Sequence, residues 1–159
     1  MSFVDKIVPR HELPQRLERV ERPLVFTNGV FDILHPGHVD YLAHARSLGA
    51  ALIIGLNSDS SARMLEKGSD RPINPEADRA WMLAALESVT LVTTFSERTP
   101  TALIEEVRPD VYVKGGDYDI DALDETKIVR SYGGRALAIP FLPGYSTTAL
   151  VDRIRRAMR

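Results

Sequence analysis

Residues 27–38 read TNGVFDILHPGH, and this stretch decides how the chain is organised. The apolar run Leu24–Phe26 enters it and is typical of a strand, and the run Val39–Leu48 leaves it with the apolar spacing of a helix. His35 and His38 therefore flank a strand-to-helix turn. Because free backbone N–H groups and the positive end of the helix dipole meet at a helix start, two imidazoles placed there form a site for phosphate oxygens.

His38 is expected in the first turn of that helix, at the top of an apolar stripe that faces the sheet. The stripe consists of Tyr41, Leu42, Ala45 and Leu48. Two other interpretations are open: the histidines are a helix cap and a loop residue that are close by chance, or they bind zinc. Zinc needs a third protein ligand. His44 lies six residues after His38, on roughly the opposite helix face.

The overall composition limits the class of protein. With 159 residues, 44% of them hydrophobic and 26% charged, the chain fits one ordinary domain. The absence of cysteine excludes disulfides, thiolate metal sites and cysteine nucleophiles. A net charge of −2 provides no basic field for nucleic acid, and no apolar run reaches membrane-spanning length. Residues 1–10 lack the apolar core of a signal peptide, so we expect a cytoplasmic protein without nucleic-acid or membrane partners.

Strand-like and helix-like segments alternate along the chain. The expected strands are Leu24–Thr27, Ala50–Leu56, Leu91–Thr94, Val111–Val113 and Ala136–Ile139. The expected helices are His38–Leu48, Ser58–Leu65, Glu76–Leu86, a helix from Thr99 as N-cap to near Arg108, Glu125–Tyr132 and Thr147–Met158. This alternation predicts an α/β fold: a Rossmann-like, doubly wound parallel sheet of five strands with helices on both faces. We expect residues 23–159 to form this domain, and residues 1–22 to be an extension with a short helix over His11–Val20.

Polar segments follow three of the expected strands. They are Thr27–Asp32, Asn57–Asp59 and Lys114–Tyr118. In parallel α/β sheets, ligands bind outside the carboxyl ends of the strands. The sequence therefore predicts one ligand site at this edge of the sheet.

Gly29 and Gly37 allow the backbone to approach a ligand closely. Their spacing is neither that of a dinucleotide GxGxxG fingerprint nor that of a P-loop, which argues against a NAD enzyme and a P-loop kinase. Phe31 and Asp32 could shape a nucleotide pocket, and plain core packing is an equal alternative for Phe31.

Lys67, Arg71 and Arg79 form a basic cluster over a loop and the helix that follows it. Cations on a loop and a fixed helix suit a triphosphate that is gripped and then released as pyrophosphate. The alternative is a solvated surface, which is the usual environment of Lys and Arg.

Two further segments complete the candidate site. The glycines of Lys114–Tyr118 offer a backbone surface for a flat base or sugar, or else a flexible turn. Ser146, Thr147 and Thr148 begin the last helix, where hydroxyl and N–H groups can hold β- and γ-phosphates or simply cap the helix.

Together these segments resemble the HxGH nucleotidylyltransferase superfamily, and within it the adenylyltransferases of ADP-heptose synthesis. The resemblance covers about Leu24 to Ile154. The stretch KGGDY at residues 114–118 indicates the heptose branch, since related glycerol-phosphate cytidylyltransferases typically carry a KGDDW-like stretch there. Val30 stands where relatives often carry Cys, and Pro36 where many carry Ala.

The resemblance implies that AMP is transferred from ATP to D-glycero-β-D-manno-heptose 1-phosphate, giving ADP-heptose and pyrophosphate for lipopolysaccharide core or other surface heptose synthesis. It also implies Mg²⁺ carried on ATP and a homodimer. In this family the domain occurs alone or fused to a sugar kinase, and because the sequence shows no kinase domain we expect a standalone enzyme. A cytidylyltransferase acting on a polyol or alcohol phosphate, and a nucleotide-binding regulator without turnover, are the alternatives.

We expect three groups of site residues. The catalytic group comprises His35, His38, Lys67, Arg71 and Arg79. The nucleotide group comprises His35, His38 and Arg79 together with Thr27, Asn28, Gly29, Val30, Phe31, Gly37, Lys114, Gly115, Asp117, Tyr118, Ser146, Thr147 and Thr148. The acceptor group comprises Asp32, Asn57, Asp59, Lys67 and Arg71. No protein side chain is expected to be a metal ligand.

Overall fold

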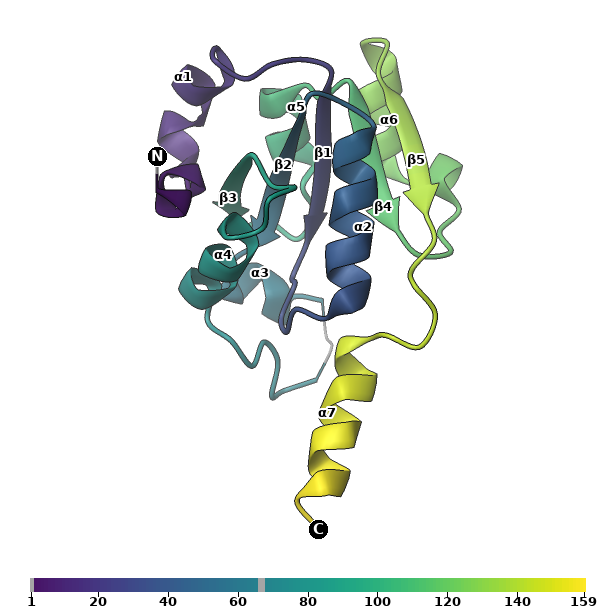
Figure 1. The fold of residues 1–159 in the computed structure, drawn as a ribbon. Helices are drawn as coiled ribbons and strands as arrows, with labels where there is room; N and C mark the ends of the chain where they lie inside the picture. Colours follow the sequence, from purple (N-terminus) through teal and green to yellow (C-terminus); the bar gives the residue numbers. More distant parts are fainter. Residues whose placement is uncertain (1, 66–67) are drawn as a thin grey trace.

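A computed structural model describes residues 2–65 and 68–159, which are built around a five-stranded sheet (Figure 1). The strands are β1 (Leu24–Gly29), β2 (Ala51–Asn57), β3 (Leu91–Phe95), β4 (Val111–Gly115) and β5 (Arg135–Ile139). Their order is β3-β2-β1-β4-β5, and every neighbouring pair is parallel. The predicted α/β class with a doubly wound, five-stranded parallel sheet is confirmed. The strand order changes direction between β1 and β4, which is where such sheets bind ligands.

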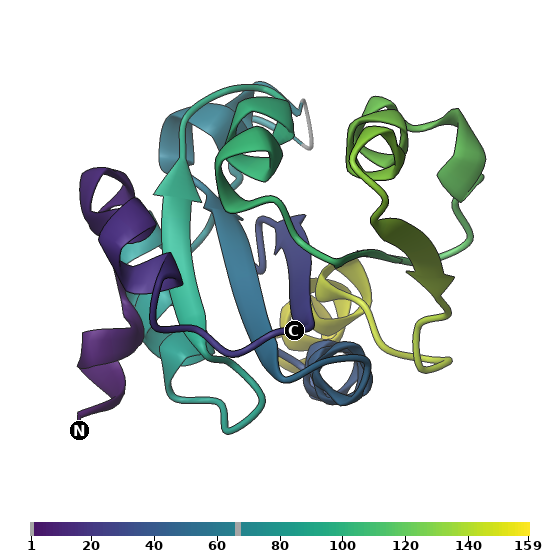
Figure 2. The same ribbon diagram turned by 90° about the horizontal axis from the view of Figure 1, so that it is seen from above.

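Helices cover both faces of the sheet (Figure 2). They are α1 (Leu13–Leu17), α2 (Pro36–Ser47), α3 (Asp59–Arg63), α4 (Glu76–Ala84), α5 (Thr101–Val107), α6 (Asp124–Ser131) and α7 (Thr147–Ala157), with 3₁₀ turns η1 (Phe3–Lys6), η2 (Arg10–Glu12) and η3 (Ile120–Ala122). α2 and α4 pack on what we call the first face of the sheet, and α5 and α6 pack on the second face. α7 extends away from the sheet, and none of its residues is buried (Figure 1).

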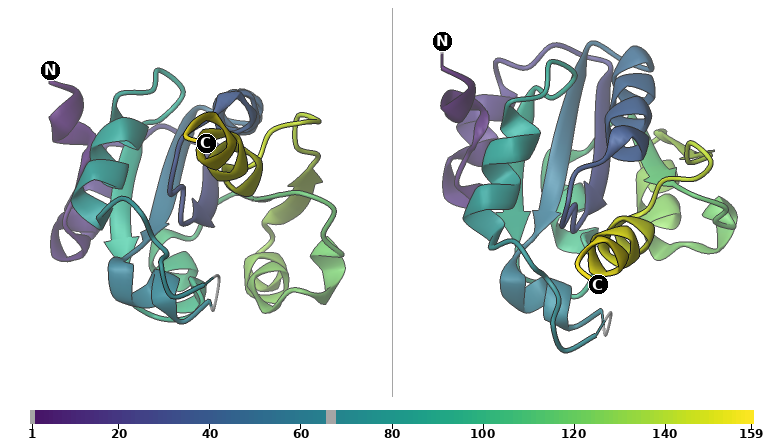
Figure 3. Two further views of the ribbon diagram at one scale, coloured as in Figure 1. Left: turned by 90° about the horizontal axis from the view of Figure 1, so that it is seen from below. Right: turned by 60° about the horizontal axis from the view of Figure 1, so that its bottom comes forward.

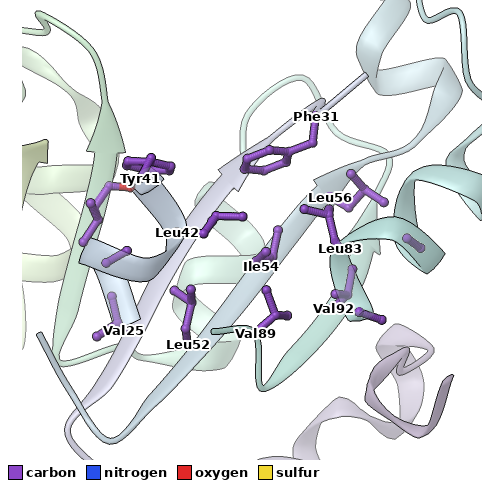
Figure 4. Close-up of a cluster of buried hydrophobic side chains, with 14 of the residues drawn as sticks. Val25, Phe31, Tyr41, Leu42, Leu52, Ile54, Leu56, Leu83, Val89 and Val92 are labelled. Carbon is purple, nitrogen blue, oxygen red and sulfur yellow. Dashed lines mark hydrogen bonds between the residues drawn. The ribbon is translucent and has the colours of Figure 1, made fainter. Parts of the chain in front are cut away.

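Two apolar cores, one on each face, hold the sheet in place. Along β1 the side chains alternate, so Val25 points to the first face and Phe26 to the second. On the first face, Ile54 packs among Leu42 of α2 and Leu83 of α4 (Figure 4). Each fully buried side chain of this kind stabilises the fold by about 1.5–3 kcal/mol. The strand ends that face the candidate site are therefore anchored from both sides.

The N-terminal extension packs along the β3 edge of the sheet. Val8 and Leu13 are buried in the second core. The Val8 amide donates to the Val92 carbonyl at 2.9 Å, and the Arg10 guanidinium contacts Glu106 at 2.7 Å. The extension thus covers an edge that would otherwise expose unpaired backbone groups.

The start of α5 differs from the prediction. Pro100, not Thr99, occupies the N-cap position. The Thr99 hydroxyl shares a hydrogen bond with the Thr101 hydroxyl at 3.2 Å and therefore caps no backbone N–H.

Two predicted helices are shorter than expected. The leading helix over His11–Val20 is reduced to α1, with a 3₁₀ turn before it. The helix over Ser58–Leu65 is reduced to α3, which Ser58 caps by accepting from the Ser61 amide at 3.1 Å. Short helices depend on tertiary contacts more than on local preference, so their ends are set by packing.

Across residues 2–65 and 68–159, no helix combines the length and the apolarity needed to cross a lipid bilayer.

Candidate active site

A cleft of about 570 Å³ opens at the carboxyl ends of β1 and β4. Many of the predicted site residues line it together: Asn28, Gly29, Val30, Phe31, Asp32, His35, His38, Arg71, Lys114, Gly115, Tyr118, Ser146, Thr147 and Thr148. Figure 3 shows the start of α7 beside the β1–α2 turn at this edge of the sheet. Segments that are far apart in the sequence therefore form one site.

The two histidines lie at the start of α2. His35 is the N-cap residue and His38 lies in the first turn. Their rings are stacked, with centroids 3.8 Å apart, and Phe31 packs edge-on against His38 at 5.3 Å. Burial lowers the pKa of His35 from its ordinary value, so its ring favours the neutral form. Its buried Nδ1 makes no hydrogen bond within the described residues.

Gly37 lets His35 and Tyr145 approach its backbone closely. A Cβ at this position would lie 3.0 Å from the His35 Nδ1 and 3.1 Å from the Cβ of Tyr145. Gly37 is buried and does not line the cleft. Gly37 thus makes room for His35 and Tyr145, whereas the sequence predicted that its backbone would approach a ligand.

Phe31 combines the two roles that the sequence left open. It is 8% exposed and belongs to the first core, and it also lines the cleft. Its φ of 47° is in the left-handed region, which is unusual for a bulky residue and stores strain. A Cβ on Gly29 would lie 2.9 Å from the Phe31 ring, so Gly29 makes room for this conformation.

Asp32 anchors the loop that precedes α4. Its carboxylate accepts hydrogen bonds from the amides of Ile73 and Asn74 at 2.9 Å and pairs with the Arg71 guanidinium at 3.3 Å. Asp32 is only 7% exposed, although it lines the cleft. Asp32 thereby holds Arg71 at the rim of the cleft.

Arg79 lies behind the wall of the cleft, not at its surface. Its guanidinium is fully buried and donates to the carbonyls of Val30 at 2.7 Å, Asn57 at 2.8 Å and Asn74 at 3.0 Å. It also pairs with Asp59 at 2.8 Å. All three nitrogens of Arg79 are therefore engaged within the protein, in contrast to the predicted contact with ATP phosphates.

The predicted acceptor residues Asn57 and Asp59 contact Arg79 and do not line the cleft. Asn57 is 3% exposed and donates to the Ser61 hydroxyl at 2.9 Å. The Asp59 carboxylate pairs with the Arg79 guanidinium, and Asp59 is not among the residues that line the cleft. Local sequence could not place them, because their partner Arg79 comes from a different helix.

Three other predicted residues do not form the cleft surface. Thr27 is buried and shares a hydrogen bond with the Tyr41 hydroxyl at 2.5 Å. Asp117 is exposed and is absent from the lining of the cleft. Lys67 lies outside the described residues.

The cleft also contains two aromatic residues: Phe141, which the sequence did not indicate, and Tyr145, which precedes the predicted hydroxyl cluster but had no predicted role. Phe141 covers Gly115, where an added Cβ would lie 2.6 Å from its ring, and Phe141 packs edge-on against Tyr41 at 5.9 Å. Tyr145 stacks on His35 with ring centroids 6.4 Å apart. The signal available in the sequence was the presence of two large aromatic residues in the short segment between an expected strand and an expected helix.

The start of α7 serves as both a helix cap and a cleft wall. The Ser146 hydroxyl accepts from the Ala149 amide at 3.0 Å, which is ordinary N-capping. Thr147 and Thr148 also line the cleft. The cleft therefore meets two helix N-termini, those of α2 and α7, and both favour negatively charged ligands.

A stacked histidine pair and two helix starts at the switch point of a parallel sheet are typical of a protein that binds phosphorylated ligands. Residues 26–153 match the profile of the cytidylyltransferase-like family, and the chain therefore belongs to that family.

Two curated relatives indicate a more specific group within this family. The D-beta-D-heptose 1-phosphate adenylyltransferase of Bordetella bronchiseptica is 58% identical over 156 residues, covering 97% of this chain and 96% of the relative. The bifunctional protein HldE of Geotalea uraniireducens is 52% identical over 132 residues, covering 83% of this chain and 27% of that longer protein. The predicted resemblance to the adenylyltransferases of ADP-heptose synthesis is confirmed.

Solved structures share the fold. The lipopolysaccharide core biosynthesis protein of Thermoplasma volcanium aligns with a TM-score of 0.63 and 29% identity over 75% of this chain and 95% of that chain. The pantoate-beta-alanine ligase of Francisella tularensis aligns with a TM-score of 0.57 and 13% identity over 96% of this chain and 78% of that chain, which shows the fold alone.

Proposed function

We propose that this protein transfers AMP from ATP to D-glycero-β-D-manno-heptose 1-phosphate and releases pyrophosphate and ADP-heptose. The observation that carries the proposal is the 58% identity with a heptose 1-phosphate adenylyltransferase along almost the whole of both chains. The convergence of the histidine pair, KGGDY and the α7 hydroxyls on one cleft supports it. The expected setting is lipopolysaccharide core or other surface heptose synthesis.

The reaction needs charge stabilisation more than proton removal. The acceptor phosphate has a second pKa of about 6 and is largely dianionic at neutral pH, so it attacks the α-phosphorus of ATP without a general base. His35 and His38, at the start of α2, contact the ATP phosphates and stabilise the charge that builds on the α-phosphate. Neutral His35 acts as a hydrogen-bond donor through one ring nitrogen.

The leaving pyrophosphate is held by the rim of the cleft. Arg71, which Asp32 holds at the rim, neutralises its charge, and Lys67 of the same loop is expected to assist. Thr147 and Thr148 bind the β- and γ-phosphates at the start of α7. Mg²⁺ enters with ATP as part of the substrate, coordinated mostly by phosphate oxygens and water.

The adenine binds on the β4 side. Gly115 and Tyr118 line this part of the cleft, and the exposed ring of Phe141 offers a stacking surface for the base. Arg79 acts through its contacts with the carbonyls of Val30, just after β1, and Asn57, at the end of β2, keeping the turn that carries the histidines in position.

The test is pyrophosphate release from ATP and, separately, from CTP, each with heptose 1-phosphate and Mg²⁺. The proposal expects release with ATP and heptose 1-phosphate only. Turnover with CTP and a polyol or alcohol phosphate would identify a cytidylyltransferase instead. Nucleotide binding without any turnover across these acceptors would identify a regulator.

A further inference from the structure

One side chain in the cleft is held by a buried group that the reaction above does not use. The Tyr112 hydroxyl donates to the Asn28 Oδ1 at 3.0 Å. Tyr112 is fully buried in the second core, and its ring stacks on Phe26 with centroids 6.4 Å apart. In the register of the sheet, Phe26 and Tyr112 lie directly side by side. The tyrosine ring is therefore fixed by packing, and its hydroxyl is a fixed donor.

The contact decides which end of the Asn28 carboxamide is available to a ligand. Burial raises the pKa of Tyr112 well above its ordinary value, so its hydroxyl remains protonated and donates. A carboxamide has one oxygen and one NH₂ group. Among the described residues, the bond from Tyr112 is the hydrogen bond that the Asn28 side chain makes. Since Asn28 lines the cleft and Tyr112 holds its oxygen in place, the NH₂ group is the donor that this side chain offers to a ligand.

The position of Asn28 indicates which substrate it meets. Side chains alternate along β1, so Asn28 points to the second face together with Phe26, whereas α2 and its histidines cover the first face. In phosphoryl-type transfers the attacking and leaving oxygens lie roughly in line on opposite sides of the phosphorus. With the triphosphate at the start of α2, the acceptor approaches from the side of Asn28.

We propose that Tyr112 is a positioning residue, which fixes the carboxamide of Asn28 so that its NH₂ group donates to an oxygen of the acceptor sugar phosphate. This inference rests on the proposed function and assigns Asn28 to the acceptor, where the sequence predicted a contact with the nucleotide. Tyr112 acts only through Asn28, so the two residues are expected to behave as one unit.

The test measures initial rates against each substrate for the wild type, Asn28→Ala, Tyr112→Phe and the double variant. Loss of one hydrogen bond corresponds to a rise of roughly 3- to 10-fold in the KM for heptose 1-phosphate. The KM for ATP and kcat should stay near wild type. Because both residues act on one hydrogen bond, the double variant should match Asn28→Ala. If Tyr112 only supported the fold, the effects of the two substitutions would add, and the double variant would be worse than Asn28→Ala.

Tyr132→Phe is the matched control. The Tyr132 hydroxyl donates to the Pro109 carbonyl at 3.2 Å, before the amino end of β4 and away from the cleft. This variant should leave both KM values unchanged. The inference is overturned if Tyr112→Phe leaves the KM for heptose 1-phosphate unchanged, if the KM for ATP rises instead, or if Tyr112→Phe has a further effect in the Asn28→Ala background.

The proposed function is tested separately, by measuring pyrophosphate release with the wild-type protein alone. If the wild type releases no pyrophosphate, calorimetric titration of heptose 1-phosphate into the same set of proteins tests the inference. Weaker binding to Asn28→Ala and Tyr112→Phe, with wild-type binding to Tyr132→Phe, would support it. Equal binding to all of them, or no binding to the wild type, would overturn it.

Discussion

The two walls of the cleft are built in opposite ways. The inner wall, residues 27–38, is tied to the core: Thr27 pairs with Tyr41, Asp32 accepts backbone amides, and Arg79 holds the Val30 carbonyl. The outer wall, residues 141–148, exposes its aromatic rings and leads into α7, which has no buried residue. Segments with few buried contacts open at low free-energy cost. The inner wall thus suits catalytic groups that need a fixed geometry, and the outer wall suits groups that bind the substrate and then release the product.

The largest expected effect is at His38, on the inner wall. We expect His38→Ala to lower kcat by roughly 10²–10³-fold, the scale for losing one transition-state donor. The fold and most of the affinity for ATP should be retained. Steady-state kinetics and nucleotide titration measure this, with the exposed His44→Ala as control. Turnover of His38→Ala near the wild-type rate would remove the histidine from the mechanism.

Substitution of Arg79 tests whether the inner wall depends on the buried hydrogen bonds and the ion pair of this side chain. Arg79→Ala should lower the free energy of unfolding by roughly 3 kcal/mol, because it leaves Asp59 and three carbonyls without their partner. At a temperature where the variant is folded, turnover and ATP binding should both fall, because the histidine turn loses its support.

The matched control for Arg79 is Arg155→Ala on α7. Arg155 contacts Asp70 at 3.5 Å and its side chain is 65% exposed, so stability should change by about 0.5 kcal/mol or less. Denaturant unfolding measures both variants. Equal stability losses would contradict the contrast between the walls, and an unchanged KM for ATP in Arg79→Ala would contradict its support of the nucleotide site.

Gly37 tests the contact between the two walls. In Gly37→Ala the new Cβ would force the His35 ring and Tyr145 to shift. We expect kcat to fall by about tenfold, since small displacements of catalytic groups are costly. Thermal unfolding should show that the variant remains folded. Wild-type turnover would mean that the tight packing of His35 is not needed for the reaction.

The smallest expected effect is the pH dependence that His35 contributes. Its pKa is lowered on folding, so the unfolded chain binds more protons around and below the ordinary pKa of about 6.5. The contribution of His35 to stability is therefore complete above that value and is lost as the pH falls. Between about pH 8 and about pH 5, the wild type should lose more stability than His35→Gln. Parallel unfolding curves for the two proteins across this range would contradict the lowered pKa.

Local patterns were sufficient to predict the inner wall. Residues 27–38 form a strand, a turn and a helix with His35 and His38 at its start, because each feature depends on neighbouring residues. The alternation of strands and helices likewise predicted the sheet and placed Lys114 and Thr148 at the same edge.

The remaining features depend on contacts between distant segments. The buried position of Arg79 requires the carbonyls of Val30, Asn57 and Asn74 to converge from three separate segments, and no local sequence spacing indicates this. Phe141 and Tyr145 enter the cleft from a loop without periodicity, where side-chain direction cannot be predicted. The homodimer, which the resemblance implied, stays a prediction.

The mechanism requires the reaction to occur at the α-phosphorus of ATP, at the start of α2. The most direct test follows radioactive phosphorus from ATP labelled at either the α or the γ position, with heptose 1-phosphate as acceptor. We expect the α label to enter the sugar nucleotide and the γ label to leave in pyrophosphate. A γ label in the sugar product, or an α label that remains in a free nucleotide, would contradict it.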